Sequence, residues 1–112
     1  QATIAAPSDA DAQSVFTGTN GLSTWSVKNE TKFKTTSISA SEFDDIELDT
    51  DIIAAADGAG NSKMNMLEVG DVIAFKTAST SAHASKAGLI KIVSINGTTS
   101  SGTIDIEVKV QQ

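Results

Sequence analysis

Three apolar runs lie close together in the last third of the chain, and they constrain the fold more than any other feature. They cover residues 71–77 (DVIAFKT), 88–95 (GLIKIVSI) and 103–110 (TIDIEVKV). The segments between them have no helical pattern, and Asn96-Gly97 is a typical turn dipeptide. We therefore expect three consecutive antiparallel strands, a meander spanning residues 70–111.

The pattern inside each run predicts its place in the sheet. The first two runs have apolar residues at consecutive positions, which indicates central strands covered on both faces. The third run alternates strictly, which predicts one polar face and a position nearer an edge. Its expected inward residues are Ile104, Ile106, Val108 and Val110, and its expected outward residues are Asp105, Glu107 and Lys109.

Composition limits the classes of protein to which the chain can belong. Its 112 residues argue for a single β-rich domain over residues 1–112. Val, Ile, Leu and Phe make up about 23% of the chain, just above the roughly 20% below which disorder is expected. The net charge of −6 disfavours a nucleic-acid partner, because phosphate binding needs a clustered basic face. No apolar run approaches the length of a membrane span, so we expect no membrane insertion by this chain.

The first part of the chain is less regular. Residues 1–20 predict an extended lead-in with one short strand near residues 14–17. Residues 22–28 alternate, which predicts a strand with Trp25 and Val27 on one face. A weaker alternation predicts another strand at residues 32–38.

Short helices are expected between residues 39 and 57. Ser39 and Glu42 have the spacing of a capping box, which predicts a helix over about residues 40–47. A competing strand pattern runs through residues 45–52, where acids alternate with aliphatic residues. Thr50 is the expected cap of a second helix over residues 51–56, and Gly58 is expected to end it in a left-handed conformation.

These elements predict a mainly β protein, built as an antiparallel sandwich or a strongly curved sheet with one or two short helices. A small closed β-barrel is the alternative. The expected core consists of Trp25, Val27, Phe33, Phe43, Ile46, Val72, Ile73, Phe75, Ile90, Ile92, Val93, Ile104, Ile106 and Val108.

Few residues stand out as candidates for chemistry. Five acids of one run, Asp44, Asp45, Glu47, Asp49 and Asp51, are candidate ligands for calcium, although such a run is usually a solvated helix face. Trp25 is a candidate platform for a sugar ring, with a core anchor as the alternative. His83 is a candidate ligand-binding residue, with a solvated loop histidine as the alternative. We expect no catalytic residue and no cofactor.

Residues 39–111 carry a family resemblance. The segments SEFDDI and IIAAAD, followed by LEVGDVIAFKT, GLIKIVSINGT and GTIDIEVKVQ, resemble β-rich modules of surface lipoproteins from Gram-negative anaerobes, most of unassigned function. More distantly, the hairpin after the Phe-Asp helix is similar to that of haem-binding lipoproteins. The resemblance implies a periplasmic, outer-surface or secreted location.

We therefore expect a non-enzymatic interaction or structural domain of an exported or cell-surface bacterial protein. The alternative is a module that binds a small ligand, either a sugar, haem or calcium. The expected partners are a protein or glycan at the cell surface, a neighbouring module, or a second copy of the chain. The chain begins at Gln1, for which a removed signal peptide or a trimmed chain is the simplest explanation.

Overall fold

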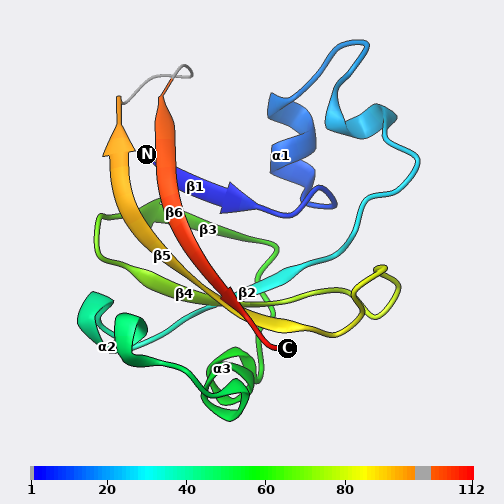
Figure 1. Cartoon of the computed structure of the whole chain (residues 1–112). Helices are drawn as coiled ribbons and strands as arrows, with labels where there is room; N and C mark the ends of the chain where they lie inside the picture. The colour runs from blue at the N-terminus through cyan, green and yellow to red at the C-terminus, as the bar shows by residue number, and fades with distance from the viewer. Residues whose placement is uncertain (1, 98–101) are drawn as a thin grey trace.

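The computed structural model describes residues 2–97 and 102–112. It is mainly β, with two antiparallel sheets and a few short helices, which confirms the predicted class at this level (Figure 1). The strands are β1 (Ala2–Ala5), β2 (Lys32–Thr35), β3 (Lys63–Leu67), β4 (Val72–Lys76), β5 (Ala87–Asn96) and β6 (Thr103–Val110). The helices are α1 (Ala10–Val15), the 3-10 turn η1 (Leu22–Thr24), α2 (Ala40–Asp45) and α3 (Asp49–Ala56).

The larger sheet contains the predicted meander. Its strand order is β2-β4-β5-β6, and all neighbours are antiparallel. At the predicted turn Asn96-Gly97, Asn96 ends β5 and Gly97 has a φ of +84°. Residues 98–101 lie outside the described residues. In the described part of the chain β2 and β6 do not pair with each other, so the alternative of a closed barrel is wrong.

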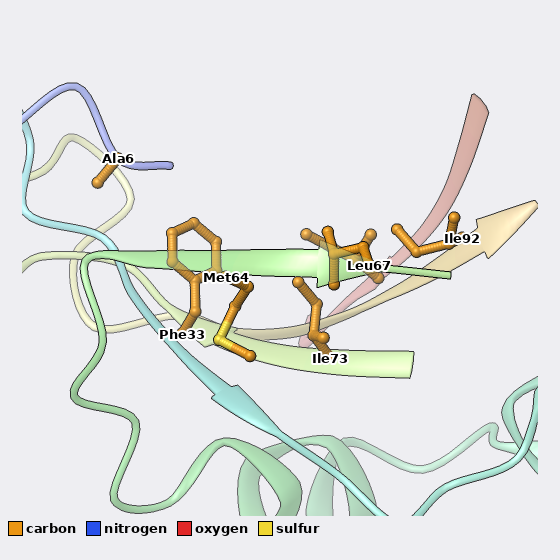
Figure 2. Packing of buried hydrophobic residues seen from close by; sticks show 7 residues of the cluster. Ala6, Phe33, Met64, Leu67, Ile73 and Ile92 are labelled. Carbon is orange, nitrogen blue, oxygen red and sulfur yellow. The ribbon is translucent and has the colours of Figure 1, made fainter. Parts of the chain in front are cut away.

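The second sheet contains only β1 and β3 and lies on one face of the larger sheet. A cluster of buried residues fills the space between the two sheets (Figure 2): Ala6, Phe33, Met64, Leu67, Ile73, Ile90 and Ile92. A second cluster lies on the opposite face, where α2 and α3 cover β4 and β5: Phe43, Ile52, Ala56, Val72, Ala74, Ala87 and Leu89. Strands β4 and β5 are therefore covered on both faces, as their continuous apolar runs predict.

Helices α2 and α3 form where the sequence predicts two short helices, but their first or last residues differ from the predicted ones. The Glu42 amide donates to Ser39 Oγ at 3.1 Å, and the Ser39 amide donates to Glu42 Oε2 at 3.4 Å, which confirms the capping box. Helix α2 ends at Asp45, two residues earlier than predicted. Helix α3 begins at Asp49 with Leu48 at its N-cap, so the prediction that Thr50 caps it is wrong. Gly58 follows with a φ of +79°, as expected.

The predicted structure of the first 28 residues is largely wrong. Residues 10–15 form α1 rather than an extended segment or a strand, because Asp9 accepts a hydrogen bond from the Ala12 amide at 3.0 Å and caps the helix. Residues 22–28 contain η1 and irregular chain instead of a strand. Trp25 and Val27 are 48% and 67% exposed, so neither belongs to the core.

Strand β3 is absent from the sequence-based prediction. Its segment, KMNML, does not alternate cleanly, because Met66 has a φ of +57° and breaks the strand period. Met64 and Leu67 nevertheless point into the core, while Met66 is exposed. The pairing of β1 with β3 is correspondingly irregular between Ala2 and Ile4.

The rest of the predicted core is confirmed at β2, α2, β4 and the first half of β5, but not toward the C-terminus. Val93 is 40% exposed because a bulge between Ile92 and Ser94 displaces it from the regular alternation. Ile106 and Val108 are also exposed, although they share the face of the sheet that carries the first cluster. Only Ile104 of that strand packs against the cluster.

Candidate interaction surface

The outer side of β6 is the most unusual surface of the molecule. The register places Ile106 beside Ile92 and Val108 beside Ile90, so the β6 side chains extend the apolar face of the sheet. Of these side chains only Ile104 packs against the cluster between the two sheets. As a result Ile106, Val108 and Val110 are 44%, 48% and 44% exposed. We call the outer side of residues 104–110 the open edge.

Main-chain groups of the open edge also point outward. The Gln111 amide donates to the Ala87 carbonyl oxygen at 3.0 Å, which identifies this as a hydrogen-bonded pair. Antiparallel pairing alternates such pairs with unbonded ones, so odd-numbered residues of β6 bond to β5. The amides and carbonyls of Ile106, Val108 and Val110 therefore face away from the sheet. They offer a template for a further strand.

The opposite edge of the same sheet is covered. Strand β2 has four residues, and its outer side bonds to the loop before β3. The Phe33 amide donates to the Asn61 carbonyl at 2.7 Å, and the Asn61 amide donates to the Phe33 carbonyl at 3.1 Å. Short edge strands and covering loops protect proteins against unwanted pairing. The larger sheet is thus protected at β2 and open at β6.

On its helix-facing side, β6 is tied to the end of α2 by Lys109. The Lys109 ammonium group donates to the carbonyl oxygens of Phe43 at 2.5 Å, Ile46 at 2.8 Å and Asp44 at 3.3 Å. It also lies 4.8 Å from the centroid of the Phe43 ring. The Phe43 carbonyl also accepts a hydrogen bond from the Ile46 amide at 3.2 Å. The end of a helix leaves carbonyl groups that a lysine can satisfy, and a cation there also interacts favourably with the helix dipole. The prediction that Lys109 points outward into solvent is therefore wrong.

A second lysine joins the same region. Lys91 on β5 contacts Asp44 Oδ1 at 2.7 Å and Glu107 Oε2 at 3.3 Å, and its ammonium lies 5.3 Å from the centroid of the Phe43 ring. The hydrogen bond to Asp44, followed by that to Glu107, raises the pKa of Lys91 above its usual range. On the polar face of β6, Glu107 therefore contacts Lys91 and Lys109 contacts the end of α2. The strand is therefore fixed against the helices while its apolar face stays open.

A cleft adjoins the open edge near the turn between β5 and β6. It has a volume of about 820 Å³ and lies between α1, η1 and β1 on one side and Ile95 and Ile104 on the other. Its lining is largely apolar, with Ile4, Val15 and Leu22 among its residues. Asp11 on α1 forms an ion pair with Lys63 on β3, and this hydrogen bond raises the pKa of Lys63.

Asp9 anchors one wall of this cleft. It is the buried acid that caps α1, and its second carboxylate oxygen accepts a hydrogen bond from the Ser62 hydroxyl. The bond from Ser62, followed by that from the Ala12 amide, lowers the pKa of Asp9 below its usual value of 3.8. The bond from Ser62 joins the N-terminal segment to the segment before β3, whereas the bond from the Ala12 amide caps α1.

This environment predicts a dependence of stability on pH. Because its pKa is lower in the folded chain, Asp9 contributes stability at pH values above its unfolded pKa, and this contribution is lost as the pH falls through the folded value. We expect Asp9→Asn to reduce the free energy of unfolding by about 1 kcal/mol near neutral pH. The difference between variant and wild type should shrink below about pH 3.8.

Urea unfolding between about pH 2 and pH 7 measures this difference. Asp45→Asn, on the exposed surface of α2, is the matched control and should change little at any pH. A constant gap between wild type and Asp9→Asn across the whole range would contradict the assigned role of the Asp9 carboxylate.

The sequence-predicted ligand residues are spread over the surface. Trp25 follows η1 in an irregular segment. His83 is exposed in the loop between β4 and β5, where its amide donates to Ser81 Oγ at 3.3 Å and its carbonyl accepts from Thr77. The structure does not bring these two residues into the cleft.

The acidic run has partners within the protein. Asp44 contacts Lys91, and both carboxylate oxygens of Asp49 accept from the Gln112 amide at 3.1 Å. Asp49 and Asp51 lie in the first turn of α3, where their charges favour the helix, and Asp45 and Glu47 are exposed. Within the described residues, no three acidic or histidine side chains are grouped so that they would hold a metal ion.

Sequence reasoning missed the cleft, because it assigned neither α1 nor β3. It did single out residues 104–110 as an edge, and their strict alternation was the available signal. None of the helices in residues 2–97 and 102–112 combines the length and apolar character that crossing a membrane requires. Comparisons of the chain with protein-family models, curated proteins and solved structures found no match.

Proposed function

We propose that this chain is a non-enzymatic interaction domain of an exported or cell-surface bacterial protein, and that it binds an extended partner segment along β6. The observation that carries the proposal is the open edge. Its outward amides and carbonyls stand beside the exposed side chains of Ile106, Val108 and Val110. Strand addition uses these two components, main-chain hydrogen bonds for affinity and alternate side chains for specificity.

The contrast between the two sheet edges supports this function. A protein that gains nothing from edge pairing is expected to protect both edges, and here β2 is covered by the loop at Asn61. We also propose that the two sheets form a sandwich, in which the β1-β3 sheet covers only part of the β2-β4-β5-β6 sheet. The resemblance of residues 39–111 to surface lipoprotein modules supports the proposed location.

A labelled ten-residue peptide in which valine alternates with threonine or lysine is a suitable probe. We expect it to bind the full chain in dilute solution, with a change in fluorescence anisotropy. Val108→Lys should weaken binding at least tenfold, because a charged side chain on the edge opposes pairing. The matched control is Val27→Lys, which places the same charge at an exposed valine far from β6 in the sequence. Equal binding to both variants, or no binding to wild type, would reject the proposal.

The cleft favours a second candidate function, the binding of a small apolar molecule. Its volume of about 820 Å³ falls in the range of ligand sites, and apolar side chains line most of it. Of the ligands considered from the sequence, a porphyrin ring matches this apolar lining better than a sugar or calcium, but the described lining contains no His, Met, Cys or Tyr that would ligate haem iron. Thermal unfolding with haemin, calcium or a glycan panel tests the candidate, because a ligand at a hundredfold excess over its Kd stabilises by about 2.7 kcal/mol. Stabilisation by haemin that Ile104→Lys abolishes supports the cleft, and no stabilisation rejects it.

A further inference from the structure

We propose that Met66 is a site of reversible oxidation, where a hydroperoxide converts the thioether of the folded chain to a sulfoxide and a methionine sulfoxide reductase restores it. The site belongs to β3, so it is separate from the proposed binding at β6 and does not depend on it. Three observations carry the proposal: the backbone conformation of Met66, its exposure, and the contrast with Met64 two residues earlier.

The backbone of Met66 turns its side chain away from the core. In a regular strand residues two apart share a face, so Met66 would lie beside the buried Met64. Its φ of +57° interrupts this alternation, and Leu67 takes the next inward position instead. The conformation is uncommon for a residue with a side chain and costs free energy. Residues held in such conformations are concentrated at functional sites, so the outlier points to a role of the exposed side chain.

The side chain of Met66 is open to solvent. The residue is 74% exposed, the highest value among the large apolar residues in the part of the chain that the structure describes. An apolar side chain left in water contributes little to the stability of the fold, because burial is the source of its stabilisation. Susceptibility of sulfur to oxidation rises with exposure. Met66 therefore presents a reactive thioether without drawing on the core.

Met64 carries the same thioether in the opposite environment. It is 9% exposed and belongs to the cluster between the two sheets, where Figure 2 shows it among Phe33 and Ile73. The side-chain amide of Asn61 donates to Met64 Sδ at 4.0 Å, which engages a lone pair of the sulfur. Oxidation of Met64 would place a polar oxygen inside this apolar cluster. The fold thus protects one methionine and presents the other.

The rest of the chain offers a hydroperoxide little competition. Thiolates are the side chains that peroxides oxidise most readily, and the sequence contains no cysteine. Its two methionines are therefore the only sulfur atoms in the chain. Since Met64 is buried, an oxidant that acts on sulfur is directed to Met66.

The oxidation transfers one oxygen atom and two electrons. The Met66 sulfur attacks an oxygen of the hydroperoxide, so an S–O bond forms as the O–O bond breaks. Sulfur is oxidised by two electrons, and the peroxide is reduced to water or an alcohol, which takes the proton of the transferred oxygen. In the reverse reaction two thiols of the reductase form a disulfide, and the sulfoxide oxygen leaves as water.

Hydrogen peroxide is the probe for the full chain in native buffer. We expect rapid uptake of one oxygen atom, located at Met66 by fragmentation of the tryptic peptide that covers residues 64–76. Met64 should react at least about tenfold more slowly. In a denaturing concentration of urea both methionines should react at similar rates, because only the fold distinguishes them. Similar rates in the folded chain, or earlier oxidation of Met64, would overturn the proposal.

Two leucine substitutions assign the rapid uptake to one sulfur. Met66→Leu keeps an exposed apolar side chain but removes the thioether, so the rapid uptake should disappear. Met64→Leu is the matched control, because it is a volume-conserving exchange in the core and leaves Met66 in place. It should take up one oxygen atom as fast as wild type. Undiminished uptake by the folded Met66→Leu chain would exclude Met66 as the site.

Reversibility needs a separate measurement on the oxidised chain. Its circular dichroism and its denaturation midpoint should match those of the unoxidised chain, because the added oxygen lies in water. The two reductases that act on opposite sulfoxide epimers should together return its mass to the original value. Unfolding on oxidation would contradict the proposal. So would a mass that stays raised while the same enzymes reduce free methionine sulfoxide.

Discussion

Replacing Lys109 by methionine is expected to reduce the free energy of unfolding by about 2–3 kcal/mol. Methionine keeps the length of the side chain but removes the charge and its three donors. The carbonyls of Phe43, Asp44 and Ile46 would lose the ammonium group that now satisfies them, and the Phe43 ring would lose a cation at 4.8 Å. The end of helix α2 would then keep the hydrogen bond from the Ile46 amide to the Phe43 carbonyl but lose all three bonds from Lys109.

Chemical denaturation followed by circular dichroism measures this loss. Lys76→Met, at the exposed end of β4, is the matched control and should change stability by less than about 0.5 kcal/mol. Lys109→Arg retains the charge and should lie between wild type and the methionine variant. If Lys109→Met unfolds at the same denaturant concentration as Lys76→Met, the contacts with α2 do not stabilise the protein.

Replacing Gly88 by valine should also cost about 2–3 kcal/mol. Gly88 lies opposite Phe75 across β4 and β5, and the Phe75 ring lies over it. A Cβ at residue 88 would come within 2.2 Å of the ring atom Cζ. The ring would have to leave its place, which disturbs the packing of Phe75 against the inter-sheet cluster.

A double-mutant cycle isolates this contact. Phe75→Leu removes the ring, so Gly88→Val should cost much less in a Phe75→Leu background than in wild type. The matched single-site control is Gly60→Val, because nothing crowds a Cβ at that residue. Additive effects of the two substitutions would show that the ring does not set the identity of residue 88.

The two strands predicted as central, β4 and β5, are the part of the fold that the sequence describes best. Their apolar residues are local and continuous, and every plausible arrangement covers both faces. The capping box is equally local, because it joins Ser39 to a residue three positions away. The prediction of a strand at Trp25 was wrong and β3 was not predicted, both for another reason. Long-range partners decide whether those segments are strands, and a window of a few residues does not contain such partners.

The candidate site was predictable only in part. Alternation in β6 identifies an edge strand, but it does not reveal which of its faces remains uncovered. That depends on how far the β1-β3 sheet extends. Strand β3 was not predicted, and its positive φ at Met66 interrupts the alternation of buried and exposed residues. Likewise, nothing near Lys109 in the sequence indicates that it caps α2, because its partners lie 63 to 66 positions away.

The distance between those partners also bears on the order of folding. Residues 109 and 112 bond to the segment 43–49, so α2 and α3 gain these contacts only after residues 109–112 have been made. Contacts of such separation slow folding, because a long loop must close before they form. During synthesis the helices would therefore wait for the C-terminal strand. We expect the emerging chain to remain incompletely ordered until residues 109–112 have left the ribosome.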